Sequence, residues 1–243
     1  MFGNLEDIVE IKRGQVGRGL LIENDGFIKG ESDMISQIKE DINNGHKFVI
    51  PEHFVVDAVF QKYGVKNANG RVYPEAMLRR AVNEYIEERV NNRCALGALD
   101  HPTAQSALSG HDVSHNILSL EWDGCTLVGQ MELHLTPGYI KYGVCSTSGD
   151  LVANMLLSNY LIGVSSRGLG TVERKGDLVV VNDDFSIICW DVVLEPSTPG
   201  AYIKSNREDL QPFIEQKTNV IDFKENPVMN DRLSRINQIL GFK

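Results

Sequence analysis

Short apolar runs rich in β-branched and aromatic residues, separated by turn residues, constrain the fold of this chain most strongly. Such runs are typical of β-strands. They cover residues 48–50, 54–60, 95–99, 111–120, 126–135, 178–181 and 185–194. Helical spacing of apolar residues is confined to a few places, chiefly after Pro74 and after Asp150. We therefore predict an α+β chain, with a mostly antiparallel, β-barrel-like core flanked by helices.

Changes in composition along the chain predict three parts. Residues 1–45 mix glycines with charged residues, and only 32–42 shows helical spacing, which indicates a loosely packed N-terminal arm. Residues 46–210 hold the strand-like runs and form the predicted domain. Residues 211–243 form a polar C-terminal segment with an amphipathic helix over 231–240. A chain of 243 residues is long enough to bury a full core.

Charge and composition exclude several classes of function. The 33 acidic and 24 basic residues give a net charge of −9, and no basic block offsets it, which disfavours nucleic-acid binding. No apolar run approaches the ~20 residues of a membrane span, and the acidic first ten residues do not resemble a signal peptide. The four scattered cysteines lack a C-x-x-C pair and indicate reduced thiols in a cytoplasmic protein.

Two adjacent hydroxyls, Ser165 and Ser166, lie between an apolar run and a glycine-rich stretch that reads as a bend. Adjacent side chains on a strand point to opposite faces, so only one of the two can enter a site. Arg167 and Gly168 follow directly, and Gly168 tolerates the positive φ that an anion-binding nest often needs. We therefore predict a nucleophile here, with Ser166, Arg167 and Gly168 binding an oxyanion or substrate.

His101 and Asp191 supply the other groups that a serine nucleophile needs. His101 precedes Pro102 at the end of an apolar run, from which its side chain can face a cleft and act as a base. Asp191 is a carboxylate within an apolar strand, and such a buried charge requires a partner. A histidine that becomes cationic during turnover is one candidate, and Arg167 or Arg174 is the other.

The remaining histidines of interest are His111 and His115. Together with His101 they suggest a zinc hydrolase, but a four-residue spacing aligns two ligands on a helix, whereas 113–120 reads as a strand. On a strand the two imidazoles share one face, which suits a second catalytic histidine or a substrate-facing role. We predict neither a metal nor a cofactor.

Four sequence blocks, in this order, resemble the prohead core proteases of tailed bacteriophages of the T-even type, which are similar in fold to herpesvirus assemblin. The blocks cover residues 67–74, 95–102, 163–170 and 191–199. The resemblance implies a serine protease domain with Ser165 as nucleophile, His101 as base and Asp191 as third member. Assemblin uses a second histidine instead, for which His111 or His115 would be candidates here.

The resemblance also implies a place of action and substrates. We expect an endopeptidase that cleaves scaffold or core proteins and the major capsid protein inside the assembling prohead, in the host bacterial cytoplasm. Self-association is a further expected partnership, and neither nucleic acid nor membrane is expected as a partner. The alternative is a catalytically inactive core or scaffold component of the same fold.

The implied cleavage site follows glutamate in Leu-x-Glu or Ile-x-Glu contexts, and Arg167 or Lys141 could bind that glutamate. Matches within this chain include those that end at Glu10, Glu23, Glu40 and Glu88. Three of them fall in the predicted N-terminal arm, so we expect the chain to cleave itself there.

Overall fold

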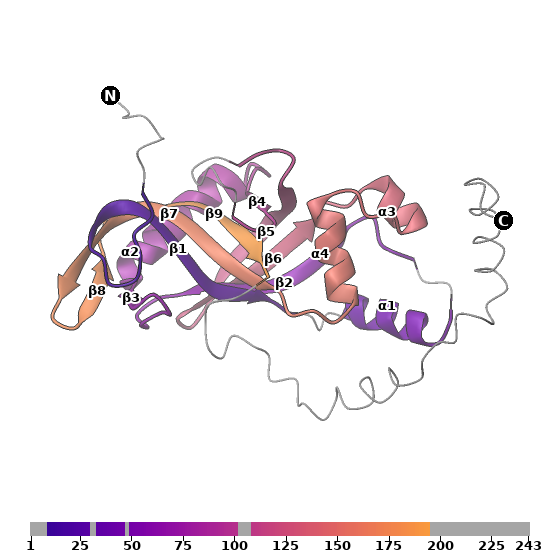
Figure 1. Cartoon of the computed structure of the whole chain (residues 1–243), viewed down its shortest axis with the longest axis horizontal. Helices are drawn as coiled ribbons and strands as arrows, with labels where there is room; N and C mark the ends of the chain where they lie inside the picture. Colours follow the sequence, from indigo (N-terminus) through magenta and orange to yellow (C-terminus); the bar gives the residue numbers. More distant parts are fainter. Residues whose placement is uncertain (1–8, 30–32, 47–48, 102–107, 195–243) are drawn as a thin grey trace, which may run out of the picture. The chain divides into compact units, whose positions relative to one another are not determined.

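The computed structural model describes residues 9–29, 33–46, 49–101 and 108–194 (Figure 1). The chain divides into two compact units, 1–201 and 202–243, and all described residues belong to the first. The predicted helix at 231–240 and the predicted domain end at residue 210 lie outside the described residues.

The described unit combines nine strands with a few helices, which confirms the α+β prediction. The strands are β1 (Gly17–Ile28), β2 (Phe54–Lys62), β3 (Arg71–Val72), β4 (Leu96–Ala98), β5 (Val113–Asp123), β6 (Thr126–Leu133), β7 (Gly163–Lys175), β8 (Leu178–Val181) and β9 (Ser186–Val193). The helices are α1 (Asp33–Asn43), α2 (Glu75–Tyr85), its π-helical continuation η2 (Ile86–Val90), α3 (Pro137–Tyr142) and α4 (Ser148–Leu157).

The strands form one curled sheet in the order β3-β8-β7-β1-β2-β6-β5-β4, and β9 pairs with β7. Each of these pairings is antiparallel except that of β3 with β8. The curl brings β4, at one end of this order, next to β9, where Leu99 forms a parallel bridge with Val192. Two segments distant in sequence thereby meet beside β7.

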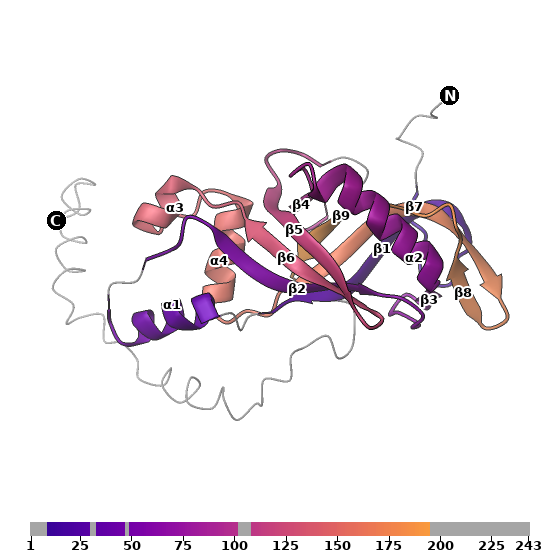
Figure 2. The same cartoon turned by 180° about the vertical axis from the view of Figure 1, so that it is seen from behind.

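Helices cover the curled sheet in two places. α2 lies across the sheet (Figure 2), and its apolar face includes Leu78, Val82 and Tyr85, each at most 4% exposed. Tyr85 packs edge-on against the buried Trp190 of β9, with ring centroids 5.0 Å apart. α1 contacts α4, and α4 contacts β5 and β6. Each large apolar side chain buried in this way contributes about 1.5–3 kcal/mol to stability.

The helix predicted after Pro74 is confirmed, and the helix start predicted at Asp150 needs a correction. α2 begins at Glu75, with Pro74 as its N-cap residue. α4 begins at Ser148 because Thr147, not Asp150, is its N-cap residue, and Asp150 completes a capping box from the third helical position. The short helix α3 was not predicted, since six residues hardly show a helical period.

The prediction of a loosely packed arm over residues 1–45 is wrong for the part that the structure describes. β1 pairs with β2 and with β7, so it is a central strand, and its Leu20 and Leu21 are each 1% exposed. α1 buries Ile35 and Ile38. The strand was missed because glycines and charged residues were taken as signs of an exposed arm. One of those charged residues, Glu23, is in fact buried.

Glu23 is the centre of a buried polar network. Its Oε1 accepts hydrogen bonds from Arg71 Nη1 (2.5 Å) and the Tyr73 hydroxyl (2.8 Å), and its Oε2 accepts one from Asn69 Nδ2 (2.7 Å). Burial raises the pKa of Glu23 although these partners act in the opposite direction. The network ties the turn before α2, in the 67–74 block, to the middle of β1.

The bend predicted after Ser166 is also wrong, because β7 runs without interruption from Gly163 to Lys175. Gly168 does not adopt a positive φ. A Cβ there would lie 2.4 Å from Cε2 of the Phe185 ring, so this glycine serves close packing between β7 and the segment before β9.

Substituting Gly97 tests the approach of β4 to β9. A Cβ at Gly97 would lie 2.1 Å from the Trp190 carbonyl oxygen and 2.4 Å from Cε1 of His115. We expect Gly97→Ala to lower the free energy of unfolding by about 1–3 kcal/mol, measured by urea denaturation. Gly110→Ala is the control, since no atom lies within 4 Å of its added Cβ. Equal stability of the two variants would contradict this packing.

Candidate active site

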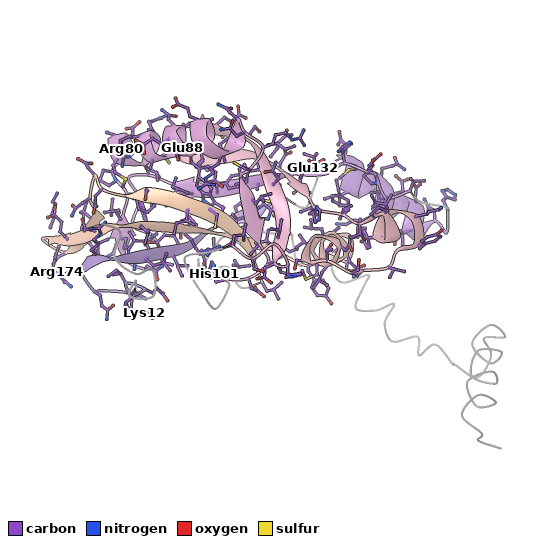
Figure 3. The ribbon with its side chains drawn as sticks, turned by 90° about the horizontal axis from the view of Figure 1, so that it is seen from above. Lys12, Arg80, Glu88, His101, Glu132 and Arg174 are labelled. Atoms are coloured by element: carbon purple, nitrogen blue, oxygen red, sulfur yellow. The ribbon has the colours of Figure 1, made fainter. Side chains whose placement is uncertain are left out.

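Ser165, His101 and Asp191 come from three separate segments and form one hydrogen-bonded chain. Ser165 on β7 lies directly opposite Asp191 on β9, so both side chains share one face of the sheet. Ser165 Oγ lies 3.0 Å from His101 Nε2, and His101 Nδ1 lies 2.9 Å from Asp191 Oδ2. In Figure 3, His101 lies on the opposite side of the sheet from Arg80 of α2. The site therefore faces away from that helix.

The carboxylate of Asp191 fixes the tautomer of His101. An ionised carboxylate only accepts hydrogen bonds, so Nδ1 of the imidazole carries the proton and donates it to Asp191. Nε2 is then left with a lone pair directed at the Ser165 hydroxyl. In this arrangement the imidazole can take a proton from the serine.

The backbone before His101 aims its side chain at the sheet. The Asp100 N–H donates to the Val192 carbonyl at 2.7 Å, and Asp100 has a φ of 61°, in the left-handed region. This conformation costs a non-glycine residue about 1–2 kcal/mol, and aspartate is among the residues that tolerate it best. The His101 side chain is 23% exposed, while Ser165 and Asp191 are fully buried. The imidazole is thus the part of the chain that solvent reaches.

Asp191 accepts five hydrogen bonds although it is fully buried. Its Oδ1 accepts from the Ala98 N–H (3.0 Å), Arg167 Nη2 (3.0 Å) and the Cys189 thiol (3.5 Å). Its Oδ2 accepts from His101 Nδ1 and Arg167 Nε. Burial acts to raise the pKa of Asp191, but the hydrogen bonds from His101 and Arg167 and the charge of Arg167 outweigh it, and the pKa lies below its ordinary value. The carboxylate is therefore ionised at neutral pH.

Both partners that the sequence suggested for Asp191 are present, since His101 and Arg167 bind it together. Arg174, the other arginine considered, instead donates to the Gly14 carbonyl at 3.2 Å. The Arg167 side chain is fully buried against Asp191, so it does not line a substrate pocket in this structure.

The nest predicted at Gly168 is wrong because that residue continues the strand. Ser166 points to the face opposite Ser165, and its hydroxyl is buried with no hydrogen-bond partner among the described residues.

Neither His111 nor His115 joins the hydrogen-bonded chain. His111 is exposed before β5 begins, and His115 is fully buried within β5, where its Nδ1 lies 2.9 Å from Ser114 Oγ. The ring of His115 packs over Gly97, and the group in contact with His101 Nδ1 is Asp191. Among residues 9–29, 33–46, 49–101 and 108–194, no three His, Cys, Asp or Glu side chains are arranged to hold a metal ion.

Sequence reasoning missed two donors to Asp191. Cys189 precedes Asp191 by two residues on the same strand, so strand alternation alone could have placed both side chains on one face. The Ala98 N–H could not have been found in this way, because its position depends on how β4 meets β9.

The buried His115 predicts a loss of stability in acid. Burial lowers its pKa from the ordinary 6.5 to about 4, because the neutral ring loses less hydration than the charged one. Between these values the unfolded chain binds a proton that the folded chain does not, so the free energy of unfolding falls as pH falls. From pH 7 to pH 5 this group contributes a fall of about 2 kcal/mol.

We expect His115→Gln to remove that part of the fall, measured by urea denaturation at both pH values. His111→Gln, at an exposed position, is the matched control for loss of an imidazole. The same fall in His115→Gln as in the native chain would show that His115 is not the group responsible.

Known proteins resemble this chain in sequence and in fold. A model of the family described as prohead core protein serine protease matches residues 19–209. The prohead core protein protease of Enterobacteria phage T4 is 31% identical over 150 residues, which cover 61% of this chain and 66% of that protein.

The solved structure of the bacteriophage T4 capsid assembly protease, gp21, covers 74% of this chain and 99% of its own, with a TM-score of 0.59 and 24% sequence identity, and shows a shared fold. The matched range begins within β1 and spans the positions of Ser165, His101 and Asp191. It covers well over half of the chain, which therefore belongs to the prohead core protein serine protease family.

Proposed function

We propose that this chain is a serine endopeptidase of phage capsid maturation, which cleaves core or scaffold proteins and capsid protein inside the assembling prohead. The observation that carries the proposal is the chain from Ser165 to His101 to Asp191, with contacts of 3.0 and 2.9 Å. Membership in the prohead core protein serine protease family supports it. A similarity of the curled sheet to herpesvirus assemblin is part of the same proposal.

The geometry supports acyl transfer through the serine. Ser165 Oγ attacks the scissile carbonyl carbon while His101 Nε2 takes the hydroxyl proton. His101 then returns that proton to the leaving amine, and a water molecule repeats the sequence to release the acyl group. Asp191 holds the imidazole in the productive tautomer throughout and stabilises the cation that forms. These three side chains supply a complete nucleophile and base without a metal or cofactor.

The proposed place of action is the assembling prohead. No helix among the described residues is both long and apolar enough to cross a membrane. Assembly together with the substrates inside the prohead would confine the enzyme to the proteins it cleaves.

The predicted preference for glutamate in Leu-x-Glu or Ile-x-Glu contexts stays part of the proposal, but the structure narrows the expected self-cleavage. Glu23 lies in central β1, Glu40 in α1 and Glu88 in η2. Removing residues 1–23 would remove more than half of β1, and removing residues 1–40 would remove all of it, although β1 pairs with β7 beside Ser165. Glu10 alone precedes β1, and the Leu20 N–H donates to the carbonyl of its neighbour Val9 at 3.0 Å. Self-cleavage that leaves the site intact is therefore confined to the peptide bond after Glu10.

Single substitutions at the two adjacent serines test the proposal. We expect the native chain to cleave a Leu-x-Glu peptide and Ser165→Ala to lose at least ~10³-fold in kcat/KM, because the nucleophile is gone. Ser166→Ala should retain activity within about threefold, because its hydroxyl lies on the opposite face of β7. The measurement is peptide cleavage followed by mass spectrometry, with intact mass of each protein recorded for self-cleavage.

Labelling with a fluorophosphonate separates the outcomes. A label on Ser165 in the native chain, absent in Ser165→Ala and in His101→Ala, supports the serine mechanism even where the peptide is a poor substrate. A native chain that neither cleaves the peptide nor accepts the label would be the inactive core component considered above.

A further inference from the structure

We infer that Arg167 is a positioning residue, which keeps the buried Asp191 charged and oriented toward His101 and so sets the pH range over which the Ser165–His101–Asp191 chain works. The inference rests on the proposed serine mechanism and assigns a role to a side chain outside its three members. Arg167 is fully buried, so it acts through Asp191 and not on the substrate.

A carboxylate in the position of Asp191 needs a cation. Its side chain is fully buried, and transfer of an unpaired charge into such an environment costs several kcal/mol. The Ala98 N–H and the Cys189 thiol are neutral donors, and the thiol is a weak one. Arg167 provides a full positive charge in contact with both carboxylate oxygens.

The two contacts also fix the direction of the carboxylate. Arg167 Nε binds Oδ2 and Nη2 binds Oδ1, which is the fork geometry of a guanidinium on a carboxylate. Oδ2 is the same oxygen that accepts from His101 Nδ1. A rotation of the carboxylate would therefore break the arginine contacts before it released the imidazole.

Arg167 Nε and His101 Nδ1 donate to the same oxygen, Oδ2 of Asp191. The arginine therefore reduces the attraction of the carboxylate for the imidazole and its proton. Without Arg167, the Asp191–His101 pair would carry an uncompensated buried negative charge. That pair would bind a proton at higher pH, whichever of the two groups received it. The protonated pair cannot accept the serine proton, so activity would be lost at a higher pH.

The other titratable groups around the pair come from four elements. Cys189 on β9 and His115 on β5 approach Asp191, and Tyr85 on α2 interacts with it more weakly. Burial raises the pKa of Cys189 and of Tyr85 and lowers that of His115. All three are therefore neutral near pH 7. Asp100, the residue before His101, lies at the end of the β4 segment.

Arg71 offers a matched control on the opposite face of the same sheet. Arg71 and Glu23 also form a buried arginine–carboxylate pair, with exposures of 2% and 0%. Glu23 lies opposite Ser166, whereas Asp191 lies opposite Ser165. Loss of either arginine leaves one unpaired buried carboxylate, but only the Arg167 pair touches His101.

The test compares Arg167→Met and Arg71→Met with the native chain in the pH dependence of kcat/KM for the Leu-x-Glu peptide. We expect the acid limb of Arg167→Met to move to higher pH by about one unit or more, with kcat/KM at pH 7 about 10–100-fold lower. Arg71→Met should keep the native acid limb even if it is less stable. An unmoved limb in folded Arg167→Met would overturn the inference.

Arg167→Lys covers the case in which the methionine variant does not fold. Lysine keeps the positive charge but cannot span both carboxylate oxygens as a fork. We expect it to keep the native acid limb, with kcat at least tenfold lower and KM unchanged, because only the orientation of Asp191 is impaired. A native kcat in this variant would contradict the positioning role.

A readout that needs no peptidase activity separates this inference from the proposed function. The imidazole of His101 is followed by NMR titration of histidine-labelled protein, with His101→Gln used for assignment. In Arg167→Met the Asp191–His101 pair, followed through the His101 resonances, should take up its proton at higher pH than in the native chain, even if no peptide is cleaved. Failure of cleavage and labelling would then count against the serine mechanism alone, whereas identical titrations would count against the role of Arg167.

Discussion

The rest of the site depends on keeping one buried carboxylate charged. Asp191 lies fully buried in β9, beside the strand that carries Ser165, the proposed nucleophile. A carboxylate in such a place is neutral unless several donors surround it. The donors come from β7, from β9 and from the segment around β4, so the curl that joins β4 to β9 is a condition for the site. The fold and the chemistry therefore share one requirement.

β7 lies between two buried ion pairs, one on each face. The pair of Arg167 with Asp191 is on the face of Ser165, and the pair of Arg71 with Glu23 is on the face of Ser166. Buried pairs of this kind add little net stability compared with apolar packing, but breaking one leaves a costly unpaired charge. Each pair thus specifies which residues must meet across the sheet. The Arg167–Asp191 pair supports the register of β7 against β9, and the Arg71–Glu23 pair ties β3 to β1.

Residues whose chemistry is visible in one segment could be found from sequence, and residues whose role depends on a partner could not. Ser165, His101 and Asp191 each stand out locally, as a hydroxyl before glycines, an imidazole at a strand end and a charge among apolar residues. Glu23 was misinterpreted because its partner Arg71 lies 48 residues away, so a central strand looked like a loose arm. Gly168 was misinterpreted because Phe185, which requires it to be small, belongs to another segment.

Pairing Asp191 with Arg167 has opposite effects at two stages of the proposed reaction. In the resting enzyme it keeps the carboxylate ionised, and this leaves Nε2 of His101 as the proton acceptor for Ser165. When the imidazolium forms, the same pairing reduces the attraction between the carboxylate and that cation, since Arg167 already neutralises part of its charge. The arrangement therefore favours a ready base over maximal stabilisation of the cation. One ion pair thus governs both how ready His101 is to accept the serine proton and how strongly the resulting cation is held.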